Sequence, residues 1–331
     1  ELAAFCDIVV SRAEEAAEKY GGPEAKVYED YRQLLEDQSI DVIHVCTPND
    51  SHADITIAAL EAGKHVMCEK PMAKTAEDAR RMLEAAKRTG KNLTIGYNNR
   101  FRPDSQYLQQ FCRDGGLGEI YFAKAHALRR RAVPTWGVFL DEEKQGGGPL
   151  IDIGTHALDL TLWMMDNYEP KTVLGSAYHK LSSRENVANA WGPWDPEEFT
   201  VEDSAFGMIT MKNGATVILE SSWALNVLEA EEARCTLAGT EAGADMKGGS
   251  LRINGESHGR LYTNHVELKT GGVAFYEGRK ESDADLEARL WIEAVLNDTD
   301  PVVKPEQALV VSEILEAIYE SAKTGKAINF D

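Results

Sequence analysis

The chain has 331 residues, 43 % of them hydrophobic and 27 % charged, which is typical of a globular protein with more than one domain. Its 55 acidic and 35 basic residues give a net charge of −20, and a surface this negative repels nucleic-acid phosphates and anionic membranes. The five cysteines show no CxxC spacing, which disfavours a disulfide framework or a zinc site. Since no apolar run approaches the roughly 18 residues of a membrane span, we expect a cytoplasmic protein.

Short apolar runs alternate with amphipathic stretches along the first part of the chain. The runs that we interpret as strands cover residues 2–6, 41–46, 64–68 and 93–97. The stretches that we interpret as helices cover residues 11–20, 31–36, 54–62 and 76–89. This alternation predicts a doubly wound parallel sheet of the Rossmann type, an α/β fold. We assign residues 1–123 to a dinucleotide-binding domain, whose ligands are expected beyond the carboxyl ends of the strands.

The pattern changes after Gly118 to longer, alternating strands. The predicted strands cover residues 120–128, 171–177, 204–211, 215–222 and 234–237, with a helix starting near Ile151 and two closing helices over 285–295 and 307–323. We assign residues 124–331 to an α+β domain with a large, mostly antiparallel sheet that helices cover on one face. The other face would need a partner, so a homodimer or homotetramer is a hypothesis.

The usual opening of a dinucleotide-binding fold is absent from the sequence. Such a fold starts with a strand and a G-x-G-x-x-G loop, and an acidic residue follows about 20 residues later. Asp7 ends a predicted strand as that acidic residue would, yet only six residues precede it. We therefore expect that the sequence starts inside the fold, without its first strand and glycine loop, and that a chain truly lacking them binds the cofactor poorly.

The tripeptide Glu69-Lys70-Pro71 directly follows a predicted strand. The proline ends the strand, so Lys70 is delivered at the carboxyl end of the sheet. A lysine in this place can bond a substrate hydroxyl and stabilise a developing alkoxide. The alternative is an ordinary surface lysine in a turn.

A glycine-rich segment, Gly146 to Leu160, contains Asp152 and His156 four residues apart. On a helix they share one face, where the carboxylate can orient the imidazole and stabilise its charged form, as a general base requires. The alternative is a helix-start aspartate and an ordinary buried histidine. We expect no metal, because no third ligand has convincing spacing.

The segment Thr47-Pro48-Asn49-Asp50-Ser51-His52 ends one predicted strand and starts a helix. Its backbone and amide groups can hold a ribose or a carboxamide, although a plain helix-capping turn is an equal alternative. Four tryptophans can stack on a sugar face, although a tryptophan more often belongs to a core. They are Trp136, Trp191, Trp194 and Trp223.

Taken together, these motifs resemble the glucose–fructose oxidoreductase / inositol dehydrogenase (Gfo/Idh/MocA) family over essentially the whole chain. The motifs that carry the resemblance are Asp7, Thr47-Pro48-Asn49 with His52, Glu69-Lys70-Pro71, Gly96 to Phe101, and Gly148 through Asp152 to His156. The resemblance implies that Lys70, Asp152 and His156 form the catalytic set. It also implies a sugar, polyol or glycoside substrate.

The resemblance further implies where the cofactor and the substrate bind. Asp7 would accept bonds from the adenosine ribose, which favours NAD over NADP, while the nearby Arg12 softens this preference. The other expected cofactor residues are Thr47, Pro48, Asn49, His52, Glu69, Lys70 and Asn98. The expected substrate residues are Arg100, Trp136, Asp152 and His156. Two rival functions use the same fold: a glycoside hydrolase or lyase that oxidises its substrate transiently with tightly held NAD, and a sugar sensor without turnover.

Overall fold

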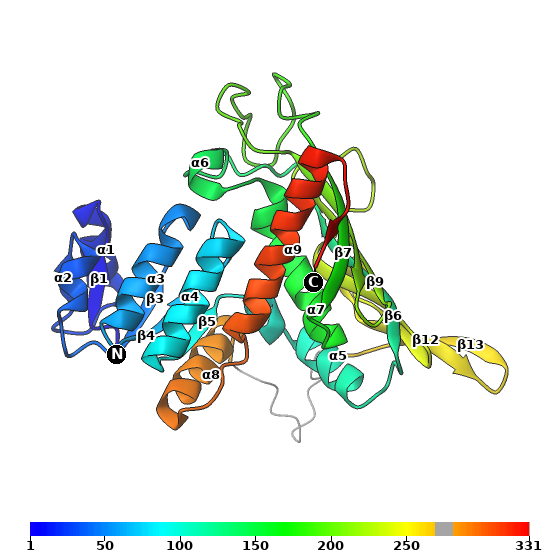
Figure 1. Ribbon diagram of the computed structural model, residues 1–331, viewed down its shortest axis with the longest axis horizontal. Coiled ribbons are helices and arrows are strands. Elements are labelled where there is room, and N and C mark those ends of the chain that lie inside the picture. The colour runs from blue at the N-terminus through cyan, green and yellow to red at the C-terminus, as the bar shows by residue number, and fades with distance from the viewer. Residues whose placement is uncertain (269–280, 331) are drawn as a thin grey trace.

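The structure is a computed structural model that describes residues 1–268 and 281–330. It consists of a parallel-sheet half, residues 1–113, and a large-sheet half, residues 120–268 and 281–330, which lie side by side (Figure 1). The carboxyl ends of the parallel strands face the junction between the two halves. The fold therefore confirms a Rossmann-like domain joined to an α+β domain with a large sheet.

The parallel-sheet half alternates short strands with helices, as the sequence predicts. Its elements are β1 (Ala4–Cys6), α1 (Val10–Tyr20), β2 (Lys26–Tyr28), α2 (Tyr31–Leu35), β3 (Val42–Val45), α3 (His52–Glu61), β4 (His65–Cys68), α4 (Ala76–Thr89), β5 (Leu93–Ile95) and α5 (Pro103–Arg113). Within the described residues β1 pairs with β2, and β3, β4 and β5 form a second parallel sheet. The sequence did not predict α5, which starts on Pro103.

Helix α4 shows how local signals set the element boundaries. Thr75 is the N-cap, and its Oγ1 accepts a bond from the Asp78 backbone N–H at 3.1 Å. Gly90 ends the helix with φ +67°, a left-handed conformation that glycine adopts without strain. The residues between them bury Ala79, Met82 and other apolar side chains on one face. Both boundaries agree with the sequence prediction.

The large-sheet half is built on nine strands in the order β13-β12-β11-β10-β6-β9-β8-β7-β14. The strands are β6 (Ile120–Leu128), β7 (Pro170–Tyr178), β8 (Ser204–Met211), β9 (Thr216–Ser222), β10 (Glu232–Gly239), β11 (Ala242–Asp245), β12 (Arg252–Ser257), β13 (Arg260–His265) and β14 (Ile328–Asn329). All neighbours are antiparallel except β6 and β9, which run parallel. The strands from β11 to β13, yellow in Figure 1, were not predicted from the sequence.

Helices α7 (Thr155–Met165) and α9 (Pro305–Thr324) cover one face of this sheet (Figure 1). The contact with α9 is close, because a Cβ at Gly175 of β7 would stand 2.6 Å from the Ile318 carbonyl oxygen. On neighbouring β8, a Cβ at Gly207 would stand 2.4 Å from Ile318 Cδ1. The two glycines therefore let the helix backbone approach the sheet.

Helices near the end of the chain also hold the two halves together. The Ala76 backbone N–H donates to Glu316 of α9 at 2.7 Å, and Arg80 pairs with Glu313 at 2.8 Å. Thr94 of β5 donates to the Val303 carbonyl oxygen at 2.9 Å, beside α8 (Asp283–Asn297). These contacts fix the carboxyl edge of the parallel strands against the large-sheet half.

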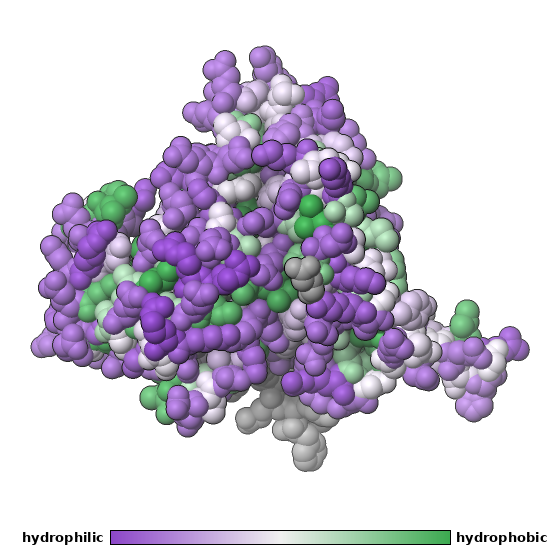
Figure 2. Space-filling view, in the orientation of Figure 1, coloured by the Kyte–Doolittle hydropathy of each residue, from purple (hydrophilic) through white to green (hydrophobic). Residues whose placement is uncertain are grey.

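The face seen in Figure 2 is mainly hydrophilic, with scattered apolar residues. This surface agrees with the charged composition of the chain. In the part of the chain that the structure describes, no helix is both long enough and apolar enough to cross a membrane.

Candidate active site

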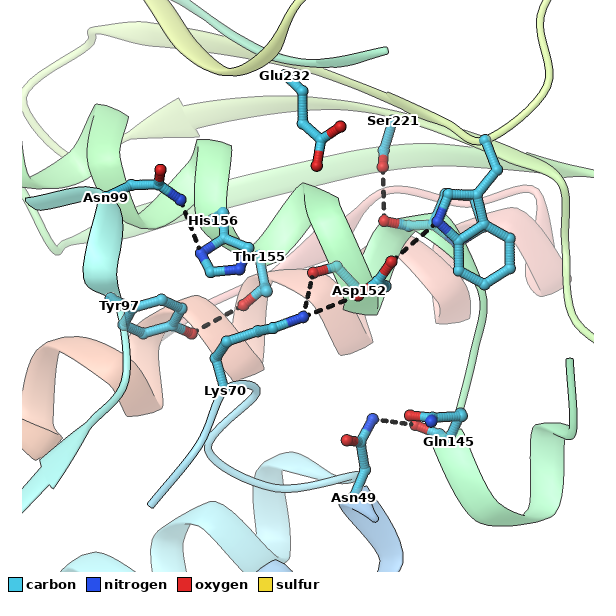
Figure 3. Close-up of polar contacts among 12 residues, drawn as sticks. Asn49, Lys70, Tyr97, Asn99, Gln145, Asp152, Thr155, His156, Ser221 and Glu232 are labelled. Carbon is cyan, nitrogen blue, oxygen red and sulfur yellow. Dashed lines mark hydrogen bonds and ion pairs between the residues drawn. The ribbon is translucent and has the colours of Figure 1, made fainter. Parts of the chain in front are cut away.

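Lys70 lies immediately beyond β4, at the edge where the parallel strands end. Its Nζ donates to Asp152 Oδ1 at 2.8 Å and to the Asp152 carbonyl oxygen at 2.9 Å (Figure 3). The Lys70 and Asp152 side chains are 20 % and 12 % exposed. The ion pair therefore joins the two halves in a setting where water screens it less than on the surface. The Lys70–Pro71 peptide bond is cis.

The Asp152 carboxylate is held by two side chains. Besides Lys70, the indole Nε1 of Trp223 donates to Asp152 Oδ2 at 3.0 Å. Burial acts to raise the pKa of Asp152, but the charge and hydrogen bond of Lys70, the charge of Arg129 and the Trp223 bond outweigh it and lower the pKa. The carboxylate is therefore ionised. Trp223 is fully buried and acts on this carboxylate rather than as a sugar-stacking surface.

The turn that carries Asp152 is π-helical, η3 (Leu150–Gly154), and it leads directly into α7. Such turns are rare and often occur at functional sites. The prediction that Asp152 directly orients the His156 ring is wrong in this structure. The Asp152 oxygens bond Lys70 and Trp223 instead, and the ring of His156 has a different partner.

That partner is Asn99, whose amide nitrogen lies 3.1 Å from His156 Nδ1 (Figure 3). The orientation of the amide follows from Arg102, which donates to Asn99 Oδ1 at 2.9 Å. The Asn99 nitrogen therefore donates to Nδ1, and the proton of the neutral ring lies on Nε2. Burial, followed by the charge of Lys70, lowers the pKa of His156 to about 3, so the ring is neutral at physiological pH.

Glu202 binds the backbone at the start of the π-helical turn η3. Its carboxylate accepts bonds from the Gly148 and Leu150 backbone N–H groups at 2.7 and 3.0 Å and from the Tyr319 hydroxyl at 2.9 Å. A Cβ on Gly148 would stand 2.2 Å from the Glu202 carbonyl oxygen, so only glycine fits there. Sequence reasoning missed Glu202, because no motif marks it.

The T-P-N segment also lies at the carboxyl edge. The Asn49 amide donates to the Gln145 carbonyl oxygen at 3.0 Å and so contacts the other half (Figure 3). His52 is buried with its ring nitrogens 2.8 Å from the Thr47 carbonyl oxygen and 2.9 Å from that of Pro71. His52 therefore links the T-P-N turn to the E-K-P turn, while Thr47 and Pro48 remain exposed.

Glu69 is oriented by a histidine that the sequence analysis did not single out. His44 Nε2 lies 3.3 Å from Glu69 Oε1, and hydrogen bonds to Cys46 and Glu69 raise the pKa of His44 to about 10. The ligand atoms of His44, Cys46 and Glu69 all lie within 4.8 Å of one another. This cluster is part of the edge at which the cofactor is expected.

Four other predicted residues lie apart from these contacts. Asp7 ends β1, and its Oδ1 accepts a bond from the Val9 backbone N–H at 2.7 Å. Arg12 is exposed on α1, and Asn98 is exposed next to the Asn99 that contacts His156. Trp136 is 50 % exposed and packs edge-on against Trp191. The binding roles assigned to these residues stay predictions.

The prediction that Arg100 binds substrate is wrong in this structure. Its side chain is 0 % exposed and forms a two-point ion pair with Asp159. Further bonds to the Val302 carbonyl oxygen and to Gln307 occupy the guanidinium. Arg100 therefore has a structural role, because its donors are used inside the protein.

A Rossmann-type sheet whose carboxyl edge presents a lysine to an aspartate of a second domain has the layout expected of a dinucleotide-dependent oxidoreductase. Comparisons with known proteins agree with this class. Residues 1–97 match the model of an oxidoreductase family with an NAD-binding Rossmann fold, and residues 105–245 match the GFO/IDH/MocA C-terminal domain. The chain belongs to the Gfo/Idh/MocA family of oxidoreductases, and its cofactor is NAD.

Individual relatives support the same assignment. The chain is 38 % identical to a D-glucoside 3-dehydrogenase of Escherichia coli, over 99 % of this chain and 90 % of the relative. It is 34 % identical to an inositol 2-dehydrogenase of Salmonella typhimurium, over 52 % of this chain and 49 % of the relative. An oxidoreductase domain protein of Kribbella flavida has the same fold, with a TM-score of 0.86, 25 % identity, and coverage of 100 % and 90 % of the two chains.

Proposed function

We propose that this protein oxidises a hydroxyl group of a sugar, polyol or glycoside and transfers the hydride to NAD. The observation that carries the proposal is the Lys70–Asp152 contact of 2.8 Å across the two halves, with neutral His156 beside it. A cationic donor next to a proton-exchanging ring is what hydride removal from a hydroxyl-bearing carbon requires. The relatives named as sugar and inositol dehydrogenases support this substrate class.

The geometry supports the following catalytic roles. Lys70 donates a hydrogen bond to the reacting oxygen and stabilises the negative charge that develops on it. Asp152 keeps Lys70 charged and in place. His156 exchanges the hydroxyl proton, and bound NAD would supply the hydride acceptor for the same carbon. The alcohol thus loses a hydride and a proton and becomes a ketone.

The tautomer of His156 bears on the direction of the reaction. With Nδ1 accepting from Asn99, the ring proton lies on Nε2, and this N–H can donate a hydrogen bond to the substrate oxygen. In the oxidative direction, the ring must instead offer a lone pair to the hydroxyl. We therefore propose that the arrangement with Asn99 is a hydrogen-bond-donating form of the site, and that the bond between Asn99 and Nδ1 must open before His156 takes the hydroxyl proton.

The carboxyl edge of the parallel strands has the polar groups that NAD would need. Asp7 lies at the end of β1, exposed Thr47 and Pro48 follow β3, and Glu69 is partly exposed after β4. We propose that Asp7 binds the adenosine ribose, and that the T-P-N segment with Asn49, His52, Glu69, Lys70 and Asn98 surrounds the nicotinamide side. The Asp7 carboxylate would repel the 2′-phosphate of NADP, so we expect NAD to be the preferred cofactor. The positive charge of Arg12 would offset part of this repulsion, so NADP should bind more weakly than NAD.

The assembly and location of the protein are part of the same proposal. We propose that the protein is a cytoplasmic homodimer or homotetramer. We also propose that its two domains comprise residues 1–123 and 124–331. The face of the large sheet opposite α9 exposes Leu174 and Met208, at 49 % and 48 %, which supports its use as an interface. Light scattering of the full-length protein tests this, since a monomer at micromolar concentration would contradict it.

A screen for NADH formation over polyols, aldoses and glycosides tests the function. We expect net NADH with at least one sugar-like substrate and none with simple primary alcohols. The hydrolase alternative predicts cleavage of glycosides with tightly held NAD and no net NADH. The sensor alternative predicts sugar binding without turnover, which would contradict the proposal.

A further inference from the structure

A strained bulge in β10 lies next to the site. The pairing of β10 with β6 shifts between Glu232 and Arg234, and the residue between them, Ala233, is buried with φ +50°. A non-glycine residue in this left-handed region is strained. Bulges beside active sites often redirect a side chain. Here the Ala233 carbonyl oxygen is held by Arg102, the residue that also orients Asn99.

Glu232 directly precedes the bulged residue Ala233, and its carboxylate forms an ion pair with Arg129. Arg129 Nε and Nη2 donate to the two carboxylate oxygens of Glu232, each at 2.6 Å. The Arg129 guanidinium in turn lies 5.4 Å from the centre of the Trp191 ring. Two parallel bonds and a ring contact fix the direction of the carboxylate.

This carboxylate lies near the proposed reacting atoms. Figure 3 shows Glu232 on the side of Asp152 and His156 opposite Lys70, with its oxygens turned toward them. The charge of Arg129 also lowers the pKa values of Asp152 and His156, although it is not the main cause for either residue. The Arg129–Glu232 pair therefore lies beside Asp152 and His156, on the side away from Lys70.

Glu232 has hydrogen-bonding capacity that Arg129 does not use. An ionised carboxylate offers about four acceptor positions, and Arg129 occupies two of them. The side chain of Glu232 is 38 % exposed, whereas that of Arg129 is 18 % exposed. The free acceptor positions are thus open to a donor that enters the site, and an anion would be repelled.

We propose that Glu232 is a specificity-determining residue that accepts a hydrogen bond from the substrate hydroxyl next to the one that is oxidised. The substrate class is then a sugar or polyol with two adjacent hydroxyls. Lys70 and His156 act on one hydroxyl, and Glu232 binds its neighbour on the other side of the site. This assignment rests on the proposed function, because it presupposes that the hydroxyl at Lys70 is the one that reacts.

The test compares Glu232→Gln with the unchanged protein on the best substrate of the NADH screen and on its monodeoxy analogues. Gln keeps the shape of the side chain but loses the charge that strengthens the bond. We expect kcat/KM for the parent substrate to fall by about 10- to 100-fold. For the analogue that lacks the neighbouring hydroxyl, which is already a poor substrate, the variant should lose less than about 3-fold.

Glu220→Gln is the matched control, because Glu220 is a partly exposed sheet glutamate paired with His126 outside the site. We expect it to change kcat/KM by less than about 3-fold for every substrate. Glu232→Asp is a second variant that keeps the charge, and thermal unfolding shows that each variant is folded. We expect Glu232→Asp to retain more discrimination between parent and deoxy substrates than Glu232→Gln.

Equal losses of Glu232→Gln on the parent and on every deoxy analogue would overturn the assignment, because Glu232 would then act only by neutralising Arg129. An unchanged kcat/KM would overturn it as well. Both results leave the proposed function intact. Failure of the unchanged protein to form NADH from any sugar or polyol would instead remove the proposed function, and this assignment with it.

Discussion

Buried charged side chains near the site have separate structural and chemical roles. Arg100 and Asp159 form a fully buried pair that holds the segment between β5 and α5 against α7. Lys70 and Asp152 form a partly exposed pair that a substrate can reach. The difference in solvent exposure between the two pairs therefore distinguishes their roles: buried Arg100 stabilises the fold, whereas we assign the partly exposed Lys70 to catalysis.

The Arg100→Met variant tests the structural role of that arginine. We expect its free energy of unfolding to fall by about 3–5 kcal/mol, because Asp159 is left as an unpaired buried charge. Urea denaturation measures this, and the KM for sugar of the folded fraction should stay within a few-fold. A variant of normal stability with a strongly raised KM would show that Arg100 binds substrate after all.

A second prediction at the residue scale concerns pH and His156. Its pKa falls from 6.5 to about 3 on folding, because burial and then the charge of Lys70 disfavour the imidazolium. Below about pH 6.5 the unfolded chain therefore takes up a proton at His156 that the folded protein does not. The free energy of unfolding consequently falls as the pH drops below this value, relative to its value at neutral pH.

Replacement of His156 by Gln should reduce the loss of stability between about pH 7 and about pH 5. Urea denaturation at both pH values measures the difference. His258 is an exposed histidine in a turn, and His258→Gln is the control that should leave the difference unchanged. If His156→Gln also leaves it unchanged, the ring is not held neutral by its surroundings.

At the scale of elements, the turn η3 depends on a residue far away in the sequence. Glu202 is buried and accepts two backbone N–H groups from residues 148 and 150 and one hydroxyl from Tyr319. Burial raises the pKa of Glu202, while the two backbone bonds and Tyr319 counteract this rise. The position of Asp152 is therefore set by a carboxylate that follows it by 50 residues.

Glu202→Ala should lower the free energy of unfolding by about 3 kcal/mol, because two buried N–H groups lose their acceptor. Activity should fall too, since Asp152 and Lys70 lose their alignment. Tyr319→Phe removes a single bond to the same carboxylate and should lower stability by about 1 kcal/mol. Denaturation and NADH formation measure both effects, and equal stability of the two variants would contradict this role.

The elements that the sequence predicts well are those with a clear apolar period. The segments at 41–46, 64–68 and 76–89 match β3, β4 and α4 closely. Strands β11 to β13 escape prediction, because β11 contains the short run Ala-Gly-Ala-Asp and β13 is exposed at all six residues. Pairing with neighbours, rather than local pattern, makes these segments strands.

The site follows a similar rule. Lys70, Asp152 and His156 could be found because they belong to motifs that stand at element ends. Glu202 and Glu232 could not, because each comes close to the site only through the pairing of distant strands in the large sheet. Trp223 is one of the four tryptophans considered for sugar stacking, but its bond to Asp152 could not be predicted for the same reason. The partner of His156 could not be predicted either, since a π-helical turn changes the geometry that an α-helix would give to Asp152 and His156.

At the scale of the whole molecule, the site exists only where the two halves meet. Lys70, Asn49 and Ala76 of the parallel-sheet half bond groups of the other half. We therefore expect a single thermal unfolding transition. NAD at about 100 times its Kd should stabilise the folded protein by about 2.7 kcal/mol. Two separate transitions, with NAD shifting only one of them, would show that the halves are not coupled; calorimetry decides this.

We propose that Lys70 from one half and the Asp152–His156 region of the other perform hydride removal over bound NAD. Single-turnover NADH formation from a substrate deuterated at the reacting carbon, in the Lys70→Ala variant, tests it most directly. We predict a hydride-transfer rate at saturating NAD that is at least about 100-fold lower, with a full deuterium isotope effect. A rate within a few-fold of the parent protein would contradict the claim.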